Sequence, residues 1–176
     1  MTTQTQKLKK EVKAIVGRAT FGLRLHKLLL ADSAVVVAFH RVNNMTVGDG
    51  LTCSVEMFKR YCSFFSKNFH VVSLRRSIEK MESGASPNGE LVITFDDGYR
   101  DNYEYAAPVL KVMGLPATFF VVTGFIGTDI VPWWDRKLSI RQQWMSWDQV
   151  RELQREGFEI GAHTRTHIDL GQVRED

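Results

Sequence analysis

The sequence predicts an α/β fold in which parallel strands alternate with helices, as a barrel or as a doubly wound sheet. Short, continuous apolar runs recur along the chain, which is typical of strands covered on both faces. Between them, apolar residues recur at helical spacing behind recognisable helix starts. This alternation favours right-handed βαβ units. The length of 176 residues, 44% of them apolar and 24% charged, fits one globular domain.

Five strands are expected, at residues 35–39, 70–72, 91–95, 117–122 and 158–161. A closed parallel barrel has about eight strands, so the expected barrel is incomplete. After His167, Leu170 and Val173, followed by Glu175 and Asp176, resemble the start of a further helix without a stop signal. We therefore expect the chain to be a fragment or a natural truncation.

Three serines are expected to cap helices. Ser54 and Ser73 each precede a segment of helical periodicity, and Ser146 forms a capping-box pattern with Gln149. Pro108 is expected to kink or delay the helix that contains it, because proline lacks the backbone N–H and clashes with the preceding turn.

Residues 1–30 form a predicted basic amphipathic extension, separate from a catalytic-type domain at residues 31–176. Its apolar residues recur at helical spacing: Leu8, Val12, Ile15, Val16, Ala19 and Leu23. Two interpretations remain open. Residues 7–30 contact an anionic membrane surface or a partner, or the helix covers the bottom of the barrel with its charges in water, which is the more usual role.

Composition and charge exclude several classes. The formal net charge is +3, but residues 1–30 contain seven Lys and Arg residues and only one acidic residue, Glu11. The rest of the chain therefore has a net charge of −3, and no nucleic-acid partner is expected. Cys53 and Cys62 lack Cys-x-x-Cys spacing and are expected to be free thiols. Neither an apolar run of membrane-spanning length nor a cleavable signal pattern is visible.

The first candidate site is the sequence Thr-Phe-Asp-Asp-Gly that ends at Gly98. It follows the apolar run at residues 91–95, and carboxyl ends of parallel strands form the ligand-binding edge of such sheets. A turn at Gly98 could bring Asp96 and Asp97 to one cavity, so that one binds a metal and the other accepts a proton. The alternative for this motif alone is an ordinary hairpin turn.

The second candidate site is the pair His163 and His167, again directly behind a predicted strand. If the residues after His163 turn helically, this spacing places both imidazoles on one face, where they can share a metal ion. Together with Asp97 they would supply two nitrogens and one carboxylate and leave positions open for water and substrate. Asp96 would then be the general base.

These motifs resemble the polysaccharide deacetylase family, the chitooligosaccharide deacetylase homology domain of carbohydrate esterase family 4. The resemblance covers roughly residues 35 to 170 and extends beyond the two sites to residues 39–42, 99–103, 115–120 and 157–163. It implies a distorted (β/α) barrel and metal-dependent removal of N-acetyl, sometimes O-acetyl, groups from amino-sugar polymers. It also implies that Asp96 is the base and that Asp97, His163 and His167 are the metal ligands.

The resemblance further implies a bound divalent ion, with Zn²⁺ preferred over Co²⁺ or another ion. It implies an acetylated amino-sugar polysaccharide or oligosaccharide as the partner and a location in the cell envelope. Family members carry later motifs with an Arg that orients the base, a Trp-bearing groove element and a His that protonates the leaving amine, and the nine residues after His167 hold none of them. Among the other histidines, His40, at the end of the first expected strand, is the best candidate to replace the His that protonates the leaving amine. We therefore expect the chain to bind metal better than it turns over substrate; the alternative is a non-catalytic metal- or glycan-binding homologue.

Two further expectations concern the tryptophans and the open edge of the sheet. The four tryptophans near the predicted site either stack on sugar rings or, more usually, pack in the core: Trp133, Trp134, Trp144 and Trp147. The unpaired edge of an incomplete barrel favours self-association.

Overall fold

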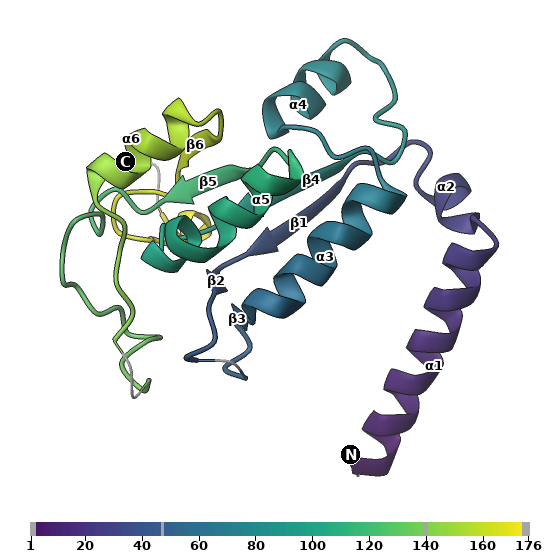
Figure 1. The fold of residues 1–176 in the computed structure, drawn as a ribbon, viewed down its shortest axis with the longest axis horizontal. Coiled ribbons are helices and arrows are strands. Elements are labelled where there is room, and N and C mark those ends of the chain that lie inside the picture. Colours follow the sequence, from purple (N-terminus) through teal and green to yellow (C-terminus); the bar gives the residue numbers. More distant parts are fainter. Residues whose placement is uncertain (1–2, 47, 139–140, 174–176) are drawn as a thin grey trace.

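The computed structural model describes residues 3–46, 48–138 and 141–173, and its centre is a parallel β-sheet (Figure 1). The sheet has the order β1-β4-β5-β6, and all neighbouring strands are parallel. Its strands are β1 (Val35–Phe39), β4 (Leu91–Phe95), β5 (Thr118–Val121) and β6 (Glu159–Ala162). The predicted α/β class is confirmed. Within the described residues the sheet stays open, with β1 and β6 at its edges.

The prediction of a strand at residues 70–72 is wrong. Only Val71 forms a bridge, to Leu91 at the start of β4. The chain leaves the sheet at once because Ser73 begins a helix. A small two-stranded sheet was not expected: β2 (Arg41–Val42) pairs with β3 (Thr52–Cys53) just beyond β1.

Three helices begin at the expected serine caps: α3 (Val55–Asn68), α4 (Leu74–Glu82) and α6 (Trp147–Arg155). The Ser54 hydroxyl accepts a hydrogen bond from the N–H of Met57, which satisfies one of the free amides of the first turn. Ser73 accepts one from the third residue of its helix in the same way. Ser146 and Gln149 form the full capping box, with both reciprocal bonds present.

Pro108 delays a helix as expected. The segment begins as η1 (Asn102–Ala106), a short π-helix, and continues as α5 (Ala107–Met113), where Pro108 occupies the first turn. The π-helical turn that precedes Pro108 changes the backbone hydrogen-bonding pattern at the point where proline lacks its N–H. Gly114 ends α5 in the left-handed conformation, at φ 63°.

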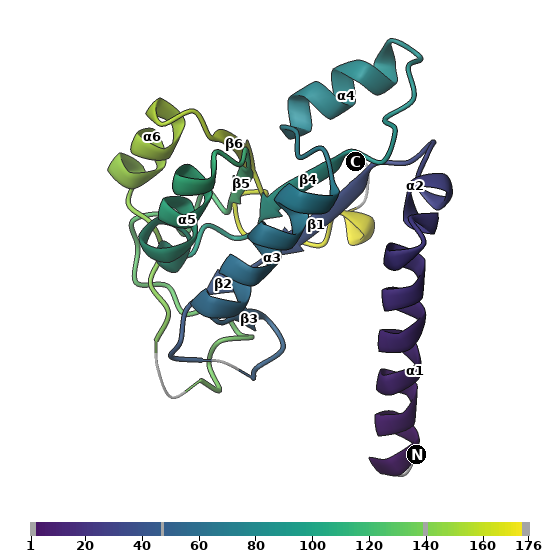
Figure 2. The same cartoon turned by 45° about the vertical axis from the view of Figure 1, so that its right-hand side comes forward.

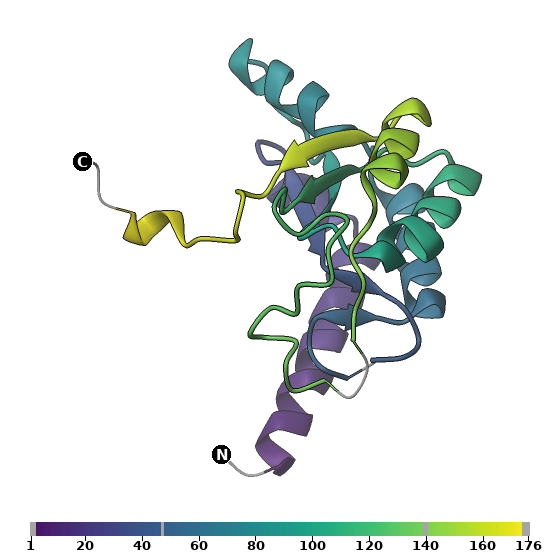
Figure 3. The ribbon, with the colours of Figure 1, turned by 90° about the vertical axis from the view of Figure 1, so that its left-hand side faces the viewer.

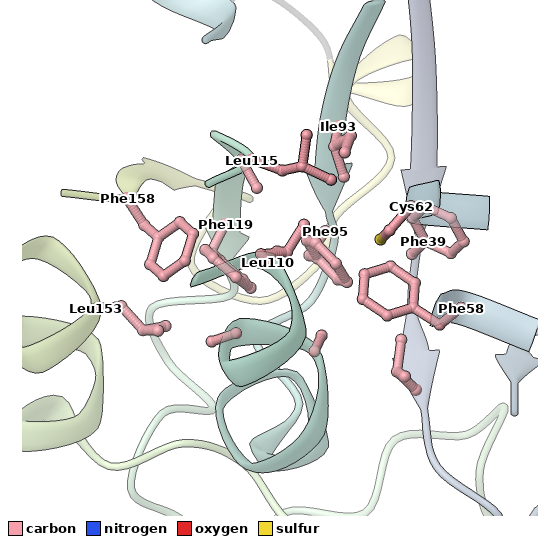
Figure 4. Close-up of a cluster of buried hydrophobic side chains, with 14 of the residues drawn as sticks. Phe39, Phe58, Cys62, Ile93, Phe95, Leu110, Leu115, Phe119, Leu153 and Phe158 are labelled. Atoms are coloured by element: carbon pink, nitrogen blue, oxygen red, sulfur yellow. The ribbon is translucent and has the colours of Figure 1, made fainter. Parts of the chain in front are cut away.

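The core lies between the sheet and helices α3, α5 and α6, which cover one face (Figures 1 and 4). A row of phenylalanines crosses the strands, because Phe39, Phe95 and Phe119 are register partners in β1, β4 and β5. The rings of Phe95 and Phe119 stack with centroids 4.7 Å apart. Phe58 of α3 and Phe158 before β6 extend this aromatic layer at its two ends. Within this row, Phe39 and Phe95 directly precede His40 and Asp96, so the row fixes the ends of β1 and β4.

The N-terminal extension is helical, as expected, in α1 (Thr3–Gly22) and α2 (Leu25–Leu29). The expectation that it covers the bottom of the barrel is wrong: α1 projects away from the sheet (Figures 1 and 2). Its apolar residues are exposed, because the helix contacts the body through a different face. None of the helices that the structure describes has the length and apolarity needed to cross a bilayer.

Beyond β6 the chain forms the loop that contains His163 and His167, called the histidine loop below. It then leaves the body and reaches η2 (Leu170–Gln172), a single 3₁₀ turn (Figure 3). The side chain of Asp169 caps this turn by accepting a hydrogen bond from Gly171. The predicted further helix is therefore present only as one turn, and its continuation at Glu175 and Asp176 lies outside the described residues.

Candidate active site

The expected site residues follow the carboxyl ends of three parallel strands. His40 directly follows β1, Asp96 directly follows β4, and His163 directly follows β6. The N–H of Asp96 donates to the carbonyl of Phe39 at 2.9 Å, which continues the ladder between β1 and β4 beyond their last paired residues. The polar side chains therefore gather at the edge where ligands bind in α/β sheets.

A tight turn at Asp97 directs its carboxylate inward. Asp97 has a φ of 74°, and the N–H of Gly98 donates to the carbonyl of Asp96 at 3.0 Å, which closes a three-residue turn. Gly98 is also left-handed, and a Cβ there would lie 2.9 Å from Cδ1 of Ile126. As a result Asp97 is only 2% exposed, whereas Asp96 is half-buried. The turn expected at Gly98 thus includes Asp97 itself.

The residues after His163 do not turn helically, so the two imidazoles are not brought together by helical spacing. Thr164 and His167 have φ values of 61° and 57°, in the left-handed region that breaks a helix. The chain folds back between them, and the side chain of Thr164 accepts a hydrogen bond from the N–H of Ile168. The two imidazoles nevertheless meet, with the ring centroids of His163 and His167 4.9 Å apart.

Asp97, His163 and His167 converge on one point. Oδ1 of Asp97 lies 3.2 Å from Nε2 of His167 and 3.6 Å from Nε2 of His163. One ligand atom from each residue lies within 4.8 Å of the others. Tetrahedral ligands at about 2.1 Å from Zn²⁺ are separated by roughly 3.4 Å, so a small divalent ion fits between these three atoms.

The electrostatics of Asp97 also fit a cation. Burial raises the pKa of the Asp97 carboxyl, positive charge on His167, His40 and His163 acts against this rise, and the negative charge of Asp96 adds to it. Its Oδ1 is buried and makes no hydrogen bond among the described residues. A buried carboxylate oxygen without a partner is costly, and a metal ion would satisfy it.

The loop that follows β5 connects the turn at Asp97 to the histidine loop through backbone hydrogen bonds. The N–H of Val122 donates to the carbonyl of Asp97 at 3.1 Å, and the N–H of His163 donates to the carbonyl of Val121 at 2.8 Å. The next two amides continue the connection, as those of Thr123 and Gly124 donate to the carbonyls of Thr164 and Arg165. Residues 121–124 therefore fix the distance between the two motifs, a role that the sequence interpretation missed.

A buried polar network supports His167 from one side. The indole ring of Trp134 lies 4.6 Å from the His167 ring, centroid to centroid, and its Nε1 donates to the Tyr99 hydroxyl at 2.8 Å. Tyr99 in turn donates to Oδ2 of Asp135 at 2.7 Å. Arg41 forms an ion pair with Asp135 and lies over the Tyr99 ring, 5.0 Å from its centroid. Arg41, Tyr99 and Asp135 are buried, and these groups satisfy one another's hydrogen bonds.

The sequence carried only a weak signal for this network. Arg41 lies two residues after the strand expected at residues 35–39, next to His40, yet nothing in the sequence showed that its partner would be Asp135. Of the other tryptophans, Trp144 is buried and stacks on Tyr99, as the packing interpretation expects, while Trp133 is 73% exposed.

The remaining histidines separate into two groups. His40 lies close enough for its charge to affect the pKa of Asp97. His26 belongs to α2 and stacks on Phe21, and His70 lies at the opposite end of β4, near Glu90. Only His40 therefore accompanies the three candidate ligands and Asp96 at the described site.

The parallel sheet and the convergent Asp97, His163 and His167 define a class of protein with an open metal-type site on an α/β fold. Comparison with known proteins identifies the family. The family model for polysaccharide deacetylases matches residues 83–176, so the chain belongs to the polysaccharide deacetylase family. It is 26% identical over 137 residues to the protein YxkH of Bacillus subtilis (strain 168), which covers 77% of this chain. It is 33% identical over 81 residues, 44% of this chain, to the poly-beta-1,6-N-acetyl-D-glucosamine N-deacetylase of Escherichia coli (strain K12).

Two solved structures share the fold. IcaB from Ammonifex degensii superposes with a TM-score of 0.65 at 26% identity over 76% of this chain. A de-N-acetylase from Aggregatibacter actinomycetemcomitans gives a TM-score of 0.60 at 27% identity over 75% of this chain. The chain spans only part of each relative: 43% of YxkH, 12% of the Escherichia coli enzyme, and 54% and 55% of the two solved chains.

Proposed function

We propose that this chain carries the metal-binding part of an N-deacetylase site that acts on acetylated amino-sugar polysaccharides of the cell envelope. The observation that supports this most directly is the convergence of the buried Asp97 carboxylate with the imidazoles of His163 and His167, beside the half-buried Asp96. The names of the relatives, among them an N-deacetylase of poly-N-acetylglucosamine, support the substrate class.

In this proposal Asp97, His163 and His167 hold one divalent ion, Zn²⁺ in preference to Co²⁺. Two nitrogens and one carboxylate are a ligand set that Zn²⁺ accepts, and three protein ligands leave a position free, as catalytic sites require. The ion supplies a Lewis acid that polarises an amide carbonyl and lowers the pKa of water. His163 and His167 are each about a third exposed, so an incoming acetyl group can reach this side of the site.

Asp96 is the proposed general base. It directly follows β4, its backbone is held by the hydrogen bond to Phe39, and its half-buried side chain is accessible to water. Asp96 would take a proton from water as the water oxygen bonds to the amide carbonyl carbon, and would return that proton to the sugar nitrogen as the C–N bond breaks. Acetate and the free amine of the sugar are then released. A well-placed general base typically contributes 10²–10⁴-fold in rate.

The test measures metal binding and turnover separately on the same variants. We expect Asp96→Asn to lower the rate of acetate release from an N-acetylglucosamine oligomer by about 10²–10⁴-fold, while Zn²⁺ affinity by titration calorimetry stays near the wild-type value. His167→Ala should lose Zn²⁺ affinity and acetate release together. His70→Ala, which removes an exposed imidazole far from the site, is the matched control and should change neither.

Two outcomes are informative. Tight Zn²⁺ binding without acetate release by the wild-type chain would favour the alternative, a metal- or glycan-binding homologue without catalysis. Equal acetate release by the wild-type chain and by Asp96→Asn would contradict the proposed role of Asp96.

A further inference from the structure

Helix α1 carries an apolar stripe whose side chains are exposed in the part of the chain that the structure describes. The larger residues of the stripe are each at least 50% exposed: Leu8, Val12, Ile15 and Val16 in α1, and Leu23 directly after its last residue. At about 100° per residue they fall within an arc of roughly 100° on one side of the helix. An exposed stripe of this kind marks an interaction surface.

The helix is attached to the body through its opposite side. Phe21 packs edge-on against Phe64 of α3, with centroids 5.0 Å apart, and stacks on His26 of α2 at 4.2 Å. Phe21 is nine residues from Val12, which at about 100° per residue places the two half a turn apart. The stripe therefore faces away from the sheet and its helices, consistent with the projecting helix in Figures 1 and 2.

Charges border the stripe on both sides. Residues 1–30 contain seven Lys and Arg residues and one acidic residue, Glu11. Lys9 and Lys13 are exposed along one border, whereas the other border has the exposed Glu11 and, beyond it, the exposed Arg18. Long cationic side chains at the border of an apolar face can extend to phosphate groups while their methylene chains stay on the apolar surface.

We propose that α1 binds the surface of an anionic lipid bilayer, with its apolar stripe among the upper acyl chains and its cations at the lipid phosphates. The charge of the segment is complementary to anionic lipid, and a stripe of this width suits a helix that lies in the interface. A second copy of the chain is the less suitable occupant, because pairing two stripes would bring two sets of cations together. The proposal is independent of the metal site.

The test is co-sedimentation of the full chain with two kinds of vesicle, phosphatidylcholine alone and phosphatidylcholine with phosphatidylglycerol in equal parts. We expect binding to the anionic vesicles that weakens with added salt. Ile15→Ser should lower this binding roughly tenfold, because a buried isoleucine side chain is lost from the bilayer. Lys13→Gln should lower it by about fivefold.

Ala14→Ser is the matched control, because Ala14 is the exposed neighbour of Ile15 but lies off the stripe. It should bind like the wild-type chain, and circular dichroism should show that both serine variants keep their helices. Equal binding of Ile15→Ser and Ala14→Ser, or equal binding to both kinds of vesicle, would overturn the proposal. A chain that ignores vesicles but forms a dimer in sedimentation equilibrium, with Ile15→Ser monomeric, would overturn it in favour of self-association.

Discussion

Gly124 donates its N–H to the carbonyl of Arg165 at 2.9 Å, and a Cβ on Gly124 would lie only 2.4 Å from that same oxygen. The loop after β5 can therefore approach the histidine loop this closely only with glycine at this position. Because the same loop also binds the carbonyl of Asp97 through Val122, the contact at Gly124 helps set the separation of the candidate metal ligands.

Gly124→Ala should weaken Zn²⁺ binding although it removes no ligand. The added methyl forces the two loops apart, and overpacking of this kind costs about 1–3 kcal/mol of the free energy of unfolding. Titration calorimetry and urea denaturation measure the two effects. Gly17→Ala is the control, since nothing lies within 4 Å of a Cβ there and alanine favours a helix. Unchanged Zn²⁺ affinity in Gly124→Ala would show that the loop contact does not position the ligands.

Asp97→Asn should separate stability from metal binding. Burial raises the pKa of the Asp97 carboxyl, so its ionised form is unfavourable in the metal-free protein at neutral pH. Asparagine tolerates the left-handed backbone at this position and carries no charge. We expect Asp97→Asn to melt at a higher temperature than the wild-type chain in the presence of chelator. Added Zn²⁺ should reverse the order by stabilising only the wild-type chain, by about 2.7 kcal/mol at a hundredfold excess over Kd.

Trp134→Phe should weaken Zn²⁺ binding through His167. The substitution keeps an aromatic ring but removes the indole N–H that bonds to Tyr99, so the ring is no longer held against the His167 imidazole. Loss of a group that orients a ligand typically costs 10–100-fold in metal affinity, and we expect about tenfold. Trp133→Phe, at the exposed neighbouring position, should change nothing; equal affinities of the two variants would contradict the positioning role.

The pH dependence of the free energy of unfolding should reveal the titration of the Asp101 carboxyl. Burial raises the pKa of this carboxyl to about 6, against the hydrogen bond from Asn43. Because the folded pKa lies above the unfolded value of about 3.9, the protonated carboxyl stabilises the fold below about pH 4. This stability is lost as the pH rises through about 6.

We therefore expect the free energy of unfolding to fall by roughly 2–3 kcal/mol between about pH 4 and pH 7 because of this group. Asp101→Asn keeps an acceptor oxygen for Asn43 and should not show the fall. Asp148→Asn, which replaces an exposed carboxylate in the first turn of α6, should retain it. Urea denaturation at several pH values measures all three proteins, and parallel curves for the wild-type chain and Asp101→Asn would refute the assignment.

Local signals in the sequence predicted much of this fold. The serine caps of α3, α4 and α6, the delay at Pro108 and four of the five strands follow from interactions within a few residues, and all are confirmed. The segment at residues 70–72 was indistinguishable from a strand by composition. Its failure to pair beyond Val71 depends on the cap at Ser73 and on the position of β4, which a short apolar run does not reveal.

The candidate site was predictable in its residues but not in its geometry. The motifs around Asp97 and His163 each follow a strand, and parallel strands bring such residues to one edge. The left-handed conformations at Asp97, Thr164 and His167 depend on the loop after β5, which lies far away in the sequence. The ion pair between Arg41 and Asp135 was missed for the same reason, since it joins residues 94 positions apart. The sequence left two roles for α1 open because it showed the apolar stripe but not that the helix would attach to the body through Phe21.

The most direct test of the proposed metal site is a crystal structure of the chain grown with Zn²⁺, with anomalous data collected at the zinc edge. We expect one strong anomalous peak between Oδ1 of Asp97 and the Nε2 atoms of His163 and His167, about 2.0–2.2 Å from each. A peak elsewhere, or none at this position at neutral pH, would contradict the assignment of these three residues as metal ligands.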